Sequence, residues 1–141
     1  MLRVLVVEER QAVRDGIKRL LAVAGEITVV GEARGTGEAA LIARGVDCDL
    51  VVLGMAAVGR EGLDDIRRLK LALPELLVLA VGPAAEADQT RETVAQGASG
   101  YLDISRARED LVKAVRVVCR GSVFVSTAAK DSGRGRAPAA S

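Results

Sequence analysis

The charged residues that could do chemistry gather at the end of the first apolar run, where Glu8 and Glu9 are followed at once by Arg10. Two carboxylates about 4 Å apart repel each other by roughly 4 kcal/mol at an effective dielectric near 20, so a cation or an arginine such as Arg10 or Arg60 must relieve them. A phosphate-binding enzyme would want a glycine-rich loop at this point, and two glutamates would repel the phosphate. The pair therefore argues against a mononucleotide-binding enzyme.

Other residue types that support catalysis are sparse. The chain has no histidine, which excludes Ser-His and Cys-His catalysis. Cys48 and Cys119 form no CxxC motif, so neither a disulfide nor a zinc site is expected. Residues 35–37 form a short Gly-Thr-Gly segment that is typical of a loop and helix N-cap. Tyr101 and Phe124 are the only aromatic residues, too few for a nucleic-acid stacking platform. We therefore expect that the chain is not an enzyme.

The composition indicates one globular domain. Its 141 residues, half of them hydrophobic and 28% charged with a formal net charge of +1, suit a single domain with a real core. The sequence contains no apolar stretch of membrane-spanning length and no signal peptide. We therefore expect a cytoplasmic protein that binds neither membrane nor, through this domain, nucleic acid.

The apolar period alternates between strand and helix along the chain. Such alternation predicts an α/β fold, a doubly wound five-stranded parallel sheet whose strand ends gather functional groups at one edge. The predicted strands cover residues 2–7, 27–31, 49–53, 76–81 and 98–102, and the helices cover 11–24, 36–43, 63–73, 86–96 and 108–120. Residues 1–125 then form one domain, and the polar residues 126–141 are expected to form a flexible tail or linker.

These segments resemble the response-regulator receiver domains, particularly those of NarL/FixJ-type transcription regulators. The resemblance runs from Leu2 to about Val125 and rests on the order and spacing of several pieces. It implies the flavodoxin-like receiver fold, (βα)5, with strand order 2-1-3-4-5. The pieces are Arg3-Val4-Leu5-Val6-Val7 with the acidic pair behind it, Val29 to Ala33, Asp49 to Leu53, Gly59 to Leu63, Ala95 to Leu102, and Leu111 to Gly121.

The resemblance also assigns roles to strand-end positions. In that family an acidic pair holds a divalent cation, an aspartate after the third strand accepts a phosphoryl group, and a Thr or Ser and a Lys follow the fourth and fifth strands. Here Glu8 and Glu9 stand at the acidic pair, Gly54 at the acceptor, Ala80 at the hydroxyl residue and Ile104 at the lysine. The phosphorylation site is thus degenerate. We expect no cofactor, with Glu8 and Glu9 as a weak Mg²⁺ site at most.

Tyr101 falls at the position of the family's switch aromatic, and an ordinary strand aromatic is the alternative. The fifth helix carries more apolar residues than one core-facing stripe needs, which predicts a self-association face. The alternative is that the segment around 123–125 folds back over this helix. The interface residues expected are Val112, Val115, Arg116, Val117 and Cys119.

Together these observations predict an atypical pseudo-receiver that acts without aspartate phosphorylation, through a protein partner or a constitutive homodimer, in transcription regulation. Two alternatives stay open. One is a phosphorelay receiver with a displaced acceptor at Asp64 or Asp65. The other is the N-terminal regulatory domain of a helix-turn-helix regulator whose effector domain is absent from this chain.

Overall fold

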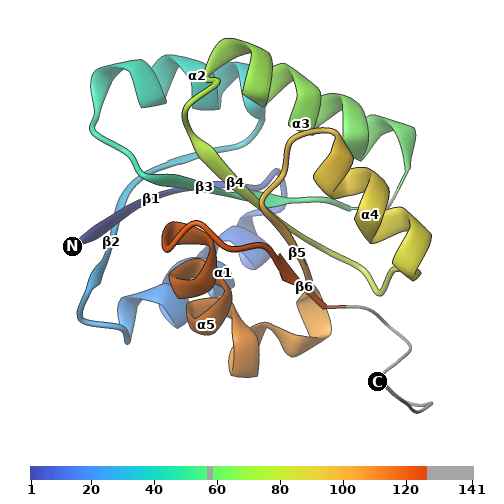
Figure 1. Ribbon diagram of the computed structural model, residues 1–141. Helices are drawn as coiled ribbons and strands as arrows, with labels where there is room; N and C mark the ends of the chain where they lie inside the picture. The colour runs from blue at the N-terminus through green and yellow to red at the C-terminus, as the bar shows by residue number, and fades with distance from the viewer. Residues whose placement is uncertain (57–58, 127–141) are drawn as a thin grey trace.

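The computed structural model describes residues 1–56 and 59–126 and shows one parallel sheet between two layers of helices (Figure 1). The sheet has six strands in the order β2-β1-β3-β4-β5-β6. Helices α1 and α5 cover one face, and α2, α3 and α4 cover the other. The elements are β1 (Leu2–Val7), α1 (Gln11–Ala22), β2 (Ile27–Ala33), α2 (Thr36–Gly45), β3 (Leu50–Gly54), α3 (Arg60–Ala72), β4 (Leu77–Gly82), α4 (Ala87–Ala95), β5 (Gly100–Asp103), a 3₁₀ turn (Ile104–Arg106), α5 (Ala107–Cys119) and β6 (Phe124–Val125).

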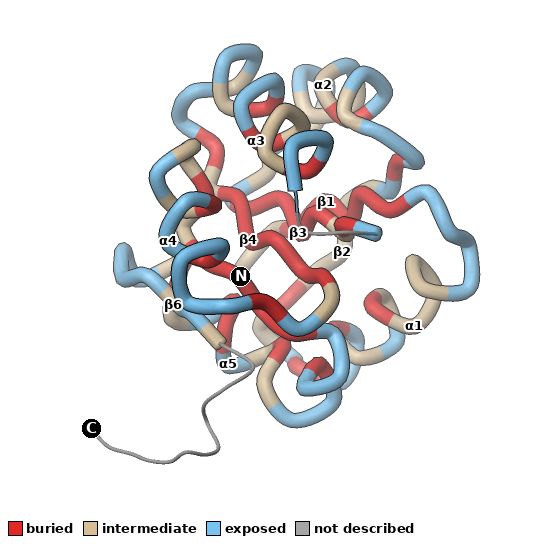
Figure 2. The backbone as a smooth tube through the Cα atoms, turned by 90° about the vertical axis from the view of Figure 1, so that its right-hand side faces the viewer, coloured by how far each residue is buried: buried red, intermediate tan, exposed pale blue. Residues whose placement is uncertain are grey.

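The central strands are buried on both faces (Figure 2), which explains why their sequences are continuous apolar runs. Successive side chains of a strand point to opposite faces. Val4 and Val6 of β1 therefore pack in the core beneath α1 and α5, whereas Leu5 and Val7 pack in the core beneath α2 and α3. The predicted doubly wound α/β fold and the order of its first five strands are confirmed.

A sixth strand departs from the predicted five. Phe124 and Val125 pair in parallel with Gly100 and Tyr101 of β5. A Cβ at Gly100 would lie 2.5 Å from the Phe124 carbonyl oxygen, so this close approach requires glycine there. The segment does fold back onto the domain: it extends the edge of the sheet, and Phe124 also packs against the core cluster that includes Leu111 and Val115 of α5. A strand of two residues is too short to leave a periodic pattern in the sequence.

The last described residue, Ser126, continues this pairing. Its amide donates to the Tyr101 carbonyl at 2.9 Å, and its hydroxyl accepts from the Asp103 amide at 2.9 Å. The predicted tail, residues 126–141, otherwise lies outside the described residues, and the domain boundary stays a prediction. Across residues 1–56 and 59–126, no helix has the length and apolar character needed to cross a membrane.

Candidate functional site

A cleft of about 370 Å³ opens at the carboxyl edge of the sheet. The loop after β1, the end of β3, the loop after β2 and the first two turns of α3 line it, and these elements contribute Glu8, Gly54, Arg34 and Asp65 among others. The strands of a parallel sheet end together at this edge, which is where ligands bind in open α/β folds. The structure thus brings Glu8, Glu9 and Gly54 together, as the sequence predicts.

Glu8 is the buried centre of the cleft, with 3% of its surface exposed. Its Oε2 accepts hydrogen bonds from the backbone amide of Arg10 at 2.7 Å and from Arg10 Nε at 2.9 Å, and its Oε1 accepts from Arg10 Nη2 at 3.0 Å. Burial acts to raise the pKa of the Glu8 carboxyl, but these hydrogen bonds and the charges of Arg10 and Arg14 hold that pKa below its usual range. Glu8 is therefore a buried carboxylate neutralised by its own neighbour.

The Glu8 carboxylate occupies the space in which a side chain at residue 54 would stand. A Cβ built on Gly54 would lie 2.0 Å from Glu8 Oε1 and 2.9 Å from Glu8 Cδ. Real Cβ atoms essentially never approach another heavy atom to less than 3.0 Å. The glycine and the longer acidic residue are therefore complementary in shape, and a side chain at 54 would require Glu8 to move.

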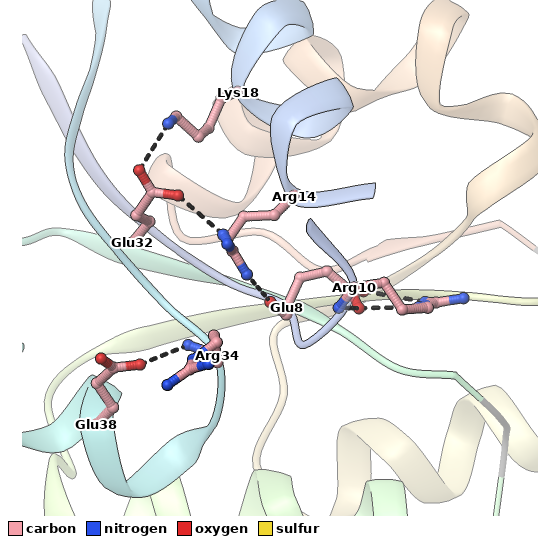
Figure 3. A network of polar contacts seen from close by, with 7 residues as sticks. All are labelled: Glu8, Arg10, Arg14, Lys18, Glu32, Arg34 and Glu38. Carbon is pink, nitrogen blue, oxygen red and sulfur yellow. Dashed lines mark hydrogen bonds and ion pairs between the residues drawn. The ribbon is translucent and has the colours of Figure 1, made fainter. Parts of the chain in front are cut away.

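A wider network holds the loop that carries Glu8 (Figure 3). Arg14 Nη1 donates to the Glu8 carbonyl oxygen at 2.7 Å, and Arg14 Nε donates to Glu32 at 2.8 Å. Lys18 Nζ donates to the other carboxylate oxygen of Glu32 at 2.7 Å. Glu9, in contrast, is exposed. The acidic pair is thus split between a buried residue and a solvated one, and Arg14 is a site residue that the sequence did not single out.

On the β4 and β5 side of the edge, Ala80 does not reach the cleft. It is fully buried inside β4 and packs in the core with Tyr101, because β4 runs on for two more residues to Gly82. Gly82 therefore holds the strand-end position that the sequence analysis gave to Ala80. A Cβ on Gly82 would lie 2.6 Å from the Tyr101 hydroxyl oxygen.

Tyr101 is fully buried, with its hydroxyl donating to the Pro83 carbonyl oxygen at 2.5 Å. Burial, followed by the charge of Asp103, raises the pKa of this hydroxyl well above its usual range. Ile104 begins the 3₁₀ turn after β5 and is 38% exposed. On this side of the edge, Gly82 and Ile104 are apolar and the tyrosine ring is buried, while the buried carboxylate of Asp103 at the end of β5 accepts hydrogen bonds from the amide and the hydroxyl of Ser105.

Residues 4–116 match the family model described as the response regulator receiver domain. The chain belongs to the response regulator receiver family. It is 34% identical over 126 residues to the response regulator GacA of Pseudomonas protegens, covering 89% of this chain and 59% of that protein. It is 28% identical over 125 residues to the nitrate/nitrite response regulator NarL of Escherichia coli, covering 89% of this chain and 58% of that protein. The receiver therefore spans less than two thirds of these curated relatives.

A solved structure supports the same assignment. The signal receiver domain of the putative response regulator NarL from Mycobacterium tuberculosis superimposes with a TM-score of 0.74 at 27% identity, covering 85% of this chain and 97% of that one. The flavodoxin-like receiver fold and the predicted family are confirmed.

The residues of this receiver do not fit a divalent cation. Glu8, Glu9, Glu61 and Asp65 line the cleft, but both Glu8 carboxylate oxygens already accept from Arg10, Asp65 pairs with Arg68, and Gly54 offers no carboxylate. Within residues 1–56 and 59–126, no cluster of three or more His, Cys, Asp or Glu side chains is placed to hold a metal ion.

Two further aspartates lie in the first turns of α3. Asp64 pairs with Arg67, and Asp65 accepts from Arg68 Nη1 at 3.3 Å. Burial raises the pKa of the Asp65 carboxyl, despite the opposing charge of Arg68. Asp65 lines the cleft, whereas Asp64 lies on the outer side between α3 and α4. Both aspartates thus have a partner one turn along their own helix.

The structure divides the predicted interface of α5. Val115 is fully buried in the receiver's own core, so it cannot belong to an exposed face; the core under α1 and α5 is wider than one helical stripe. Val112 and Val117 are half-buried, and Cys119 is half-buried where it lines a hollow at the opposite edge of the sheet. Arg116 pairs with Glu26. Most of the excess apolar surface on α5 is therefore used inside the domain.

Proposed function

We propose that this receiver domain signals without aspartate phosphorylation. The observation that carries the proposal is the state of the acceptor position: Gly54, at the end of β3, has no side chain to phosphorylate, and Glu8 Oε1 fills the adjacent space. If a conformational change brought the carboxylate of another residue into this space, that carboxylate would lie close to the Glu8 carboxylate. Like charges at such distances repel by several kcal/mol.

The remaining groups of the phosphorylation chemistry are also missing. A phosphoryl group carried by a receiver needs a hydroxyl that can bind it and a cationic side chain that can neutralise it. Gly82 and Ile104 stand at the two strand ends where the family resemblance assigns these groups, and neither can do this work. The acceptor carboxylate, the hydroxyl and the lysine all serve phosphorylation, and the absence of all three supports a receiver that is not phosphorylated. We propose no catalytic role for the chain.

We assign the domain to protein contacts in transcription regulation, in the cytoplasm. The support comes from its relatives. The response regulator GacA, which the chain matches, is longer than this receiver, and the chain spans 59% of it. A further relative with 26% identity and a TM-score of 0.73 is described as a LuxR family DNA-binding response regulator from Silicibacter pomeroyi. A DNA-binding effector domain joined to this receiver follows as a proposal. Half-buried Val112 and Val117 of α5 are the candidates for a homodimer contact.

The test is incubation of the full chain with acetyl phosphate and Mg²⁺, followed by intact-mass spectrometry. A receiver with aspartate at the acceptor position serves as the positive control under the same conditions. We expect the control to gain a phosphoryl group and this chain to gain none. A phosphoryl adduct on this chain would contradict the proposal, and peptide mapping to Asp64 or Asp65 would establish a displaced acceptor instead.

A further inference from the structure

We propose that the Arg10 guanidinium takes the place, in this cleft, of the divalent cation that the receiver resemblance implies. The inference deepens the proposed function and rests on it, because a domain that exchanged phosphoryl groups would need the metal. It starts from a disagreement between the expected ligand and the residues present. The Glu8 carboxylate, the one buried acidic group of the cleft among the described residues, is bound on both oxygens by Arg10 (Figure 3).

Every polar group of Glu8 has a partner from this chain. The amide donates to the Ala33 carbonyl oxygen at 2.9 Å, and the carbonyl oxygen accepts from Arg14 Nη1 at 2.7 Å. The carboxylate accepts one backbone and two side-chain hydrogen bonds from Arg10. An ion arriving from solution would therefore have to displace a guanidinium that is already in contact with both carboxylate oxygens.

The geometry favours the arginine over a dissolved ion. A planar guanidinium that meets a carboxylate through two parallel N–H groups makes the strongest common charge-assisted contact in proteins. Arg10 is two residues from Glu8, so the cation is tethered and loses no translational freedom on binding. Gly54 removes the carboxylate that would otherwise add to the attraction for a divalent ion. One positive charge then balances one buried negative charge.

The surrounding network restrains the loop in this arrangement. Arg14, at the end of the first turn of α1, links the Glu8 main chain to Glu32 on β2, and Lys18 binds the same carboxylate from the next turn. The loop between β1 and α1 is thus held by the main chain and the side chain of Glu8 at once. This arrangement leaves exposed Glu9 outside the ion pair.

The experiment measures the thermal unfolding of the full chain as MgCl₂ is added, for the wild type, Arg10→Gln and the matched control Arg34→Gln. Arg34 is an exposed arginine that lines the same cleft, so its substitution removes the same charge without touching Glu8. We expect no Mg²⁺-dependent shift in the wild type or in Arg34→Gln. Arg10→Gln should melt about 5 °C lower without metal and should recover saturably as Mg²⁺ binds the released carboxylate.

Two further variants keep the test decisive. Glu8→Gln/Arg10→Gln should lose the Mg²⁺ response, because its proposed ligand is gone, and Arg10→Lys should keep a tethered cation and show no response. The inference is overturned by saturable Mg²⁺ stabilisation of the wild type, by a response in Arg10→Lys, or by the absence of a response in a folded Arg10→Gln. If Arg10→Gln does not fold, Arg10→Lys and the double variant decide. A wild type that binds Mg²⁺ yet gains no phosphoryl mass would refute this inference alone and leave the proposed function standing.

Discussion

The two halves of the carboxyl edge differ in the side chains that fill them and in how their charges are paired. On the β1 and β3 side, the bare Gly54 is matched by a longer acidic residue that fills its space and by an arginine that neutralises that residue. On the β4 and β5 side, the buried carboxylate of Asp103 accepts hydrogen bonds from Ser105 instead of pairing with an arginine. The Tyr101 hydroxyl lies against Gly82, and Ile104 remains partly exposed.

The partner of the buried carboxylate differs between the two halves, a cationic arginine for Glu8 and a neutral serine for Asp103. A carboxylate that stays buried needs a partner, since leaving it unpaired costs several kcal/mol. Glu8 stays buried, so its half of the edge retains a charge pair. On the other half, Gly82 and Ile104 carry no charge that needs a partner, and the hydrogen bonds from Ser105 satisfy the buried Asp103 carboxylate. The comparison predicts that substitutions on the β1 and β3 side have the larger effects.

The largest effect is expected for Gly54→Asp, which restores an acceptor carboxylate without making room for it. The new side chain must displace Glu8 and adds a like charge, so we expect a loss of about 4 kcal/mol in the free energy of unfolding. Urea denaturation measures it. Gly54→Ala, with the steric conflict alone, should cost about 1 to 3 kcal/mol. Adding Glu8→Asp to Gly54→Asp should recover part of the loss, and failure to recover any would contradict the steric argument.

The next effect concerns the acid stability that Glu8 provides. Because the folded-state pKa of Glu8 is lowered, its charge stabilises the fold above its ordinary value of 4.5, and this contribution is lost as the pH falls through the lowered value. As the pH is lowered from neutral to acidic, the free energy of unfolding should therefore fall less steeply for Glu8→Gln than for the wild type. Glu32, whose pKa is also lowered, by hydrogen bonds from Lys18 and Arg14, contributes equally to both proteins. Identical slopes would show that Glu8 is not a stabilising charge.

A smaller effect is expected for Tyr101→Phe. The substitution leaves the Pro83 carbonyl oxygen without its donor and should cost about 1 kcal/mol in urea unfolding. The wild-type ring can be monitored directly, since the chain has one tyrosine and no tryptophan. Its ultraviolet titration should begin only well above the ordinary pKa of tyrosine, because burial raises that pKa. A normal titration curve would indicate an outward-facing ring.

The smallest effect is expected for Ile104→Lys, which returns an ammonium group to the β5 end. Ile104 is 38% exposed, and surface substitutions of this kind usually change stability by less than about 0.5 kcal/mol. The same variant should remain unphosphorylated by acetyl phosphate in intact-mass spectrometry, since Gly54 is unchanged. A large loss of stability would show that the two halves of the edge do not differ as described.

The sequence was informative wherever a long period or a strong local signal existed. Continuous apolar strands and amphipathic helices predicted the layers, the family resemblance implied the strand order, and the acidic pair with Gly54 at the strand ends predicted the position of the cleft. Arg10 was considered as a counterion because it is adjacent to Glu8, and the structure places it in that role. A contact between residues that are close in the chain can be predicted from the sequence alone.

Features that depend on strand register or on contacts between residues distant in the chain could not be predicted from the sequence. The end of β4 was placed too early, which put Ala80 instead of Gly82 at the edge, because an apolar strand gives no signal for its last residue. Val115 was assigned to a surface because the width of a core depends on how far α1 and the sheet cover α5. The filling of the Gly54 space by Glu8 depends on the register between β1 and β3.

The edge strand β6 gives the receiver a point of mechanical attachment. Ser126 is bonded to the backbones of Tyr101 and Asp103, so the end of the described chain is fastened to β5 and not to the surface of a helix. A pull or twist applied beyond this residue would load the β5 backbone first, at the carbonyl of the buried tyrosine. In a longer protein, force would thus pass between a following domain and the interior of this one without any change at Gly54.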